Sequence, residues 1–100
     1  MQEVEQYRAQ LEALCRRFGV RRLELFGSAA SGQLEAQSDL DFLVEFESPE
    51  APGYSERYFG LLEALQALFG RPVDLVVASA VTNPYFRAAV EKTKRLLYAA

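Results

Sequence analysis

The chain contains no histidine, no tryptophan and a single cysteine, Cys15. Without histidine there is no imidazole base, so the common serine and cysteine triads and histidine-ligated zinc sites are excluded. One cysteine cannot form an internal disulfide. Because Cys15 falls on the apolar stripe of an expected helix, we predict that it is a buried small hydrophobic residue and not a nucleophile.

Long apolar runs and an excess of basic residues are also missing. No apolar stretch approaches the roughly 18 residues that a membrane span needs, and the polar, acidic start of the chain is unlike a signal peptide. The net charge of −3 argues against a broad nucleic-acid-binding surface. We therefore expect a cytoplasmic protein whose partners include neither membranes nor nucleic acids.

The composition is typical of one globular domain, residues 1–100, because half of the residues are hydrophobic and a quarter are charged. Helical and strand periodicities alternate along it with short connections between them. This order predicts an α/β (α+β) fold, a small mixed β-sheet with packed helices. The expected helices cover 3–18, 55–69 and 84–94, with a short one starting at Ser28, and the expected strands cover 20–26, 39–46, 72–78 and 96–98.

The most informative segment joins a Gly27-Ser28 turn to Asp39-Leu40-Asp41 at the start of an apolar strand. Alternate side chains of a strand share a face, so Asp39 and Asp41 point the same way, roughly 7 Å apart along the backbone. Two such carboxylates repel each other unless a divalent cation lies between them. The backbone N–H groups of the turn can hold a phosphate. The segment therefore predicts a site for a metal-bound nucleoside triphosphate.

A third acid, Asp74, is the only polar residue in the apolar run 72–78. If that strand lies beside 39–46, Asp74 joins the other two carboxylates. Each feature also has a plainer interpretation: a solvated strand start for Asp39 and Asp41, an exposed sheet edge for Asp74, and a simple tight turn with a helix cap for Gly27-Ser28.

The segment from Gly27 to Gly32 also matches the opening of a P-loop. Gln33 and Leu34 follow it, where a P-loop has lysine and then serine or threonine. The side chain that should reach the phosphates is absent, so the P-loop interpretation is disfavoured.

Taken together, these motifs resemble the nucleotidyltransferase superfamily of DNA polymerase beta, and are most similar to its small branch, the minimal nucleotidyltransferases. The resemblance covers nearly the whole chain. It implies that Gly27 and Ser28 bind phosphate and that Asp39, Asp41 and Asp74 hold two Mg²⁺ ions, with Asp74 also helping to deprotonate the attacking hydroxyl. Carboxylate oxygens suit a hard cation carrying triphosphate, and paired metals can stabilise both oxygens of an in-line displacement.

Minimal members are commonly encoded beside a helical HEPN toxin. The resemblance implies transfer of AMP from the substrate ATP to a tyrosine hydroxyl of such a partner, which makes this chain the antitoxin. Many members carry arginine where this chain has Ser31, and this departure implies weaker catalytic activity. The alternative is a catalytically weak binding module that neutralises its partner by contact. A third hypothesis, transfer to a small molecule such as an aminoglycoside or to RNA ends, is disfavoured because such enzymes usually carry an added acceptor domain.

Overall fold

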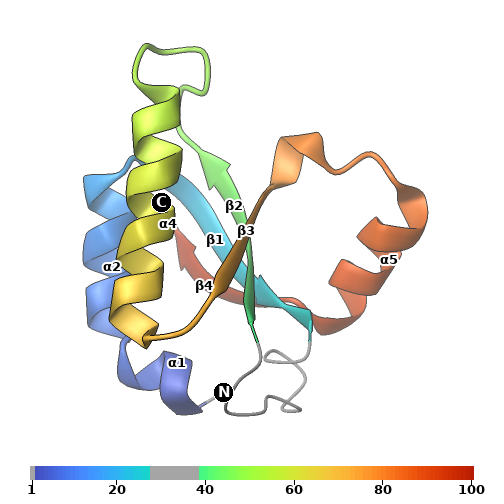
Figure 1. Ribbon diagram of the computed structural model, residues 1–100. Coiled ribbons are helices and arrows are strands. Elements are labelled where there is room, and N and C mark those ends of the chain that lie inside the picture. Colours follow the sequence, from blue (N-terminus) through green and yellow to red (C-terminus); the bar gives the residue numbers. More distant parts are fainter. Residues whose placement is uncertain (1, 28–38) are drawn as a thin grey trace.

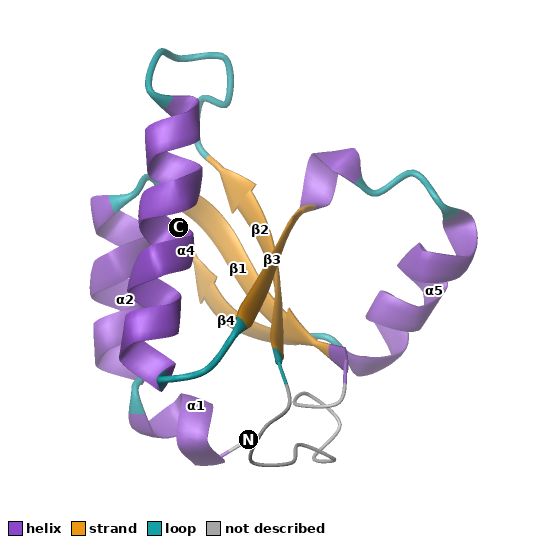
Figure 2. Cartoon of the chain, viewed as in Figure 1, coloured by secondary structure: helices purple, strands orange, loops and turns teal. Residues whose placement is uncertain are grey.

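A computed structural model describes residues 2–27 and 39–100 as a four-stranded sheet flanked by helices. Figure 1 shows α2 and α4 side by side against one face of the sheet and α5 on the other side, and Figure 2 separates the elements by type. The predicted short helix at Ser28 lies outside the described residues. The elements are α1 (Gln2–Gln6), α2 (Arg8–Arg17), β1 (Val20–Phe26), β2 (Leu40–Phe46), α4 (Tyr54–Phe69), β3 (Val73–Val77), the 3₁₀ turn η1 (Ala78–Ala80), α5 (Pro84–Thr93) and β4 (Arg95–Ala99).

The strand order is β3-β2-β1-β4. β1 pairs antiparallel with both β2 and β4, whereas β2 and β3 are parallel. A parallel pair needs a crossover connection, and α4 provides it. The predicted α/β fold with a small mixed sheet and packed helices is therefore confirmed.

The side chains of β2 alternate between the two faces of the sheet. Leu40, Phe42 and Val44 are fully buried beneath the helices, whereas Asp41 and Leu43 point to the other face and are half-buried. Apolar side chains of α2 and α4 complete the core on the helix-covered face. They are Leu11, Cys15, Leu61, Leu65 and Phe69.

Cys15 lies within this core and is fully buried. Burial raises the pKa of its thiol to about 12, because a thiolate would lose its hydration there. The expectation that Cys15 is a buried small hydrophobic residue is confirmed.

The first helix differs from the prediction, because residues 3–18 are not continuous. The chain turns at Tyr7, whose N–H donates to the carbonyl of Val4 at 3.1 Å, three residues back, and whose ring packs edge-on against Phe69. This aromatic contact joins residues far apart in the sequence, so helical periodicity alone does not reveal it. None of the helices within 2–27 and 39–100 has the length and apolar character needed to cross a bilayer.

The start of the second strand also differs by one residue. Pairing begins at Leu40, whose N–H donates to the carbonyl of Pro72 at 3.1 Å, and Leu40 is opposite Val73 in the parallel ladder. No residue of β3 pairs with Asp39, so Asp39 precedes the strand and is exposed.

Candidate active site

Gly27 and Asp41 meet where β1 ends and β2 begins. Gly27 has a φ of +74°, a left-handed conformation that L side chains rarely adopt. A Cβ atom placed on it would stand 2.5 Å from Oδ2 of Asp41. Glycine is therefore required here twice, by the backbone conformation and by the space that the carboxylate occupies.

The third acid lies on the neighbouring strand. The strand of Asp74 lies beside β2, which is the condition under which the sequence places Asp74 with the other acids, and Asp41 and Asp74 are directly opposite in the parallel β2–β3 pair. Burial raises the pKa of Asp41, and the negative charges of Asp74 and Asp39 raise it further. The structure thus brings all three predicted carboxylates within electrostatic reach of one another, with Asp41 and Asp74 as the paired members and Asp39 at the exposed rim.

Tyr58 of α4 holds β3 in place behind Asp74. Its hydroxyl donates to the carbonyl of Leu75 at 2.6 Å, one residue beyond the acid. The pKa of Tyr58 is raised, mainly by burial and then by the charge of Asp74. A protonated phenol is the form that donates this hydrogen bond, so the shift favours the observed contact.

The chemistry of these acids suits Mg²⁺, although they do not form a closed metal cage. Among residues 2–27 and 39–100, no three His, Cys, Asp or Glu side chains are grouped so that they could hold a metal ion. Mg²⁺ is usually bound by one or two carboxylates together with substrate phosphates and water, so a pair is sufficient on the protein side. Asp41 and Asp74 would supply that pair, and a cation would relieve the repulsion that raises the pKa of Asp41.

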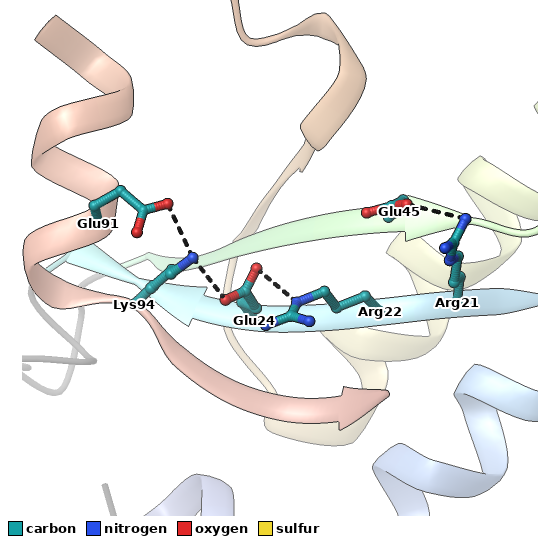
Figure 3. Close-up of polar contacts among 6 residues, drawn as sticks. All are labelled: Arg21, Arg22, Glu24, Glu45, Glu91 and Lys94. Atoms are coloured by element: carbon teal, nitrogen blue, oxygen red, sulfur yellow. Dashed lines mark hydrogen bonds and ion pairs between the residues drawn. The ribbon is translucent and has the colours of Figure 1, made fainter. Parts of the chain in front are cut away.

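A groove of about 620 Å³ follows the same face of the sheet toward the other ends of β1 and β2. Leu43, Phe46 and Val90 contribute apolar walls, but Asp41 and Asp74 do not line it. Charged side chains run along this face (Figure 3). The ion pairs are Arg21–Glu45 at 3.6 Å, Arg22–Glu24 at 3.3 Å, Lys94–Glu24 at 3.6 Å and Lys94–Glu91 at 2.9 Å.

Sequence reasoning did not identify Thr93, Lys94 or Glu24 as neighbours of this site. The Thr93 hydroxyl accepts a hydrogen bond from the N–H of Gly27 at 3.1 Å, across 66 positions of sequence. Glu24 is buried, although it belongs to the polar half of an alternating strand. No local pattern marks these contacts, because they depend on where α5 meets β1.

The predicted phosphate-binding pair is described only in part. Gly27 lies at the site, but its N–H is already used by Thr93. Ser28 and Ser31 lie outside the described residues.

The comparison of sequences gives one consistent family. The model of the nucleotidyltransferase domain matches residues 8–97. The protein adenylyltransferase MntA of Thermococcus cleftensis is 41% identical over 75 residues, which cover 75% of this chain and 73% of that protein.

Solved structures agree with the fold. A structure provisionally described as a minimal nucleotidyltransferase is 35% identical with a TM-score of 0.72, covering 92% of this chain and 93% of its own. A second, at 17% identity and a TM-score of 0.67, is the complex of a tri-AMPylated Shewanella oneidensis HEPN toxin with an MNT antitoxin. The match covers 97% of this chain and 73% of that chain and shows a shared fold. With the family model matched over most of its length, this chain belongs to the nucleotidyltransferase domain family, in its minimal branch.

Proposed function

We propose that this nucleotidyltransferase transfers AMP from ATP to a tyrosine hydroxyl of a HEPN-type toxin and thereby acts as its antitoxin. The observation that carries the proposal is the pairing of Asp41 with Asp74 beside the Gly27 corner. A relative named as a protein adenylyltransferase and a fold neighbour complexed with an AMPylated HEPN toxin support the choice of acceptor.

In the proposed reaction, the tyrosine oxygen forms a bond to the α-phosphorus of ATP. The bond from that phosphorus to the bridging oxygen breaks, and pyrophosphate leaves. Asp74 is the more exposed of the paired acids, so its carboxylate can receive the phenolic proton. Asp41, whose carboxylate occupies the space that a side chain at position 27 would fill, would hold and orient a metal-bound triphosphate. Mg²⁺, when bound, would neutralise charge on the triphosphate and on the leaving oxygen.

The direct test is incubation of the purified chain with a purified HEPN protein encoded beside it, Mg²⁺ and ATP labelled at the α-phosphate. We expect label on a tyrosine of the HEPN protein, and a loss of at least about 100-fold in rate with Asp74→Asn. Glu63→Gln is the matched control, since it makes the same carboxylate-to-amide change at an exposed position of α4.

Chelation of Mg²⁺ by EDTA should abolish labelling. Absence of label with the wild-type chain, or equal labelling by wild type and Asp74→Asn, contradicts the enzymatic proposal.

A contact-only antitoxin is the second candidate, favoured by Ser31 in place of the arginine found in many family members. A growth assay with co-expressed toxin separates the two. If the double variant Asp39→Asn, Asp41→Asn still rescues growth, neutralisation is by contact; if rescue is lost while the two proteins still co-purify, it depends on the site.

A further inference from the structure

Helix α5 is held to the sheet mainly by its C-terminal end. Although α5 is described over its full length, only Val90 is buried, and Tyr85 near the start of the helix is 86% exposed. Phe86 makes one edge-on ring contact with Phe26 of β1. A helix with so little apolar burial depends on its few specific contacts for its position.

Two of those contacts come from adjacent residues at the helix end, and they reach β1 and the glycine that directly follows it. The Thr93 hydroxyl donates to the carbonyl of Ala89 at 3.3 Å, so its lone pairs are free to accept the N–H of Gly27. The next residue, Lys94, pairs with the buried Glu24, which Arg22 approaches from the other side (Figure 3). We name Thr93, Lys94, Glu24 and Gly27 the α5–β1 clamp.

The clamp bears directly on the candidate active site. Gly27 is the residue whose missing Cβ makes room for the Asp41 carboxylate. A glycine has wide backbone freedom, so an ordered partner for its N–H limits the orientations that its peptide can adopt beside Asp41. The side chain that restricts this corner is that of Thr93, 66 residues further along the chain.

We infer that Thr93 is a positioning residue: its hydroxyl fixes Gly27 against Asp41, and the Lys94–Glu24 pair keeps the helix end in reach. The effect on catalysis rests on the proposed function, whereas the effect on Gly27 does not. The hydrogen bond to Glu91 and then the charge of Glu24 raise the pKa of Lys94. Both interactions therefore favour the charged ammonium form that pairs with Glu24.

The test uses Thr93→Val, which keeps the shape of the side chain and removes the acceptor, and Thr93→Ser, which restores a hydroxyl. Thr82→Val is the matched control, since Thr82 is exposed in the segment just before α5. In the nucleotide-free protein, amide hydrogen exchange at Gly27 is expected to be roughly 3- to 10-fold faster in Thr93→Val, the factor expected for one lost hydrogen bond. Thr93→Ser and Thr82→Val should exchange as the wild type does.

In the transfer assay, Thr93→Val should raise the KM for ATP by a similar factor and change kcat by less than about twofold. A purely structural role would lower the melting temperature and leave KM unchanged. Unaltered exchange at Gly27 in Thr93→Val, or failure of Thr93→Ser to restore it, overturns the inference. If the wild-type chain transfers no AMP, the proposed function fails, and the exchange rates alone decide the role of Thr93.

Discussion

The two faces of the sheet differ in what they bury. On the helix-covered face, Leu40, Phe42 and Val44 of β2 have no exposed surface. On the face toward α5, the intervening residues Asp41 and Glu45 are charged and partly exposed, and ion pairs take the place of an apolar core. One strand thus serves stability with one set of alternate residues and the candidate chemistry with the other. Substitutions on the two faces should therefore have separable effects.

The largest effect on stability is expected from Phe42→Ala on the helix-covered face. The ring is fully buried and stacks on Phe69 with centroids 6.0 Å apart, so its removal leaves a cavity. We expect a loss of about 3–5 kcal/mol in the free energy of unfolding, measured by urea denaturation. A loss under about 1 kcal/mol would mean that this face is not the core that supports the sheet.

Alanine substitutions at two glycines should have effects of intermediate size. Both glycines have a positive φ, but only one of them lies at the candidate active site. Gly70 has a φ of +66° with nothing within 4 Å of an added Cβ, whereas a Cβ at Gly27 meets Asp41. Alanine at either position should cost about 1–2 kcal/mol of stability through backbone strain. Only Gly27→Ala should also weaken binding of ATP with Mg²⁺, because the carboxylate of Asp41 must move aside.

Calorimetric titration with ATP and Mg²⁺ checks this expectation. If Gly70→Ala and Gly27→Ala weaken binding equally, the effect is one of general stability. The close approach of Gly27 to Asp41 would then have no functional meaning.

The smallest effect is expected from Asp41→Asn in metal-free buffer containing EDTA. Burial and the charges of Asp74 and Asp39 raise the pKa of Asp41 above its ordinary value of 3.8, so the folded state binds this proton more tightly than the unfolded chain does. The protonated acid therefore favours folding below pH 3.8, and that advantage is lost as the pH rises through the folded pKa.

At pH 7 the ionised Asp41 destabilises the folded state. Asp41→Asn should therefore raise the melting temperature by about 2–4 °C, which corresponds to roughly 0.5 kcal/mol in the free energy of unfolding. The gain should disappear near pH 3. Glu63→Gln, the same change on an exposed helix position, should leave the melting temperature within about 1 °C. A lower melting temperature for Asp41→Asn at pH 7 would contradict the electrostatic description of this site.

The alternation in β2 was readable from the sequence, because each step along a strand moves a side chain to the opposite face. The same pattern marked Asp74 as a polar residue in an apolar strand, but its parallel position directly opposite Asp41 came from the structure, since the sequence left open which strands are neighbours. The turn at Tyr7 and the contact between Thr93 and Gly27 were not predictable. Both depend on contacts between residues that are distant in the sequence. A local sequence pattern does not indicate which distant ring or hydroxyl will form such a contact.

We expect the face of the sheet toward α5 to bind ATP with Mg²⁺ through Asp41 and Asp74. Calorimetric titration of the wild-type chain with ATP, with and without Mg²⁺, and of Asp74→Asn under the same conditions tests this directly. We predict saturable binding that requires Mg²⁺ and is weakened at least about tenfold by Asp74→Asn, the equivalent of roughly 1.4 kcal/mol. Equal affinity in both proteins, or no binding by the wild type, would contradict it.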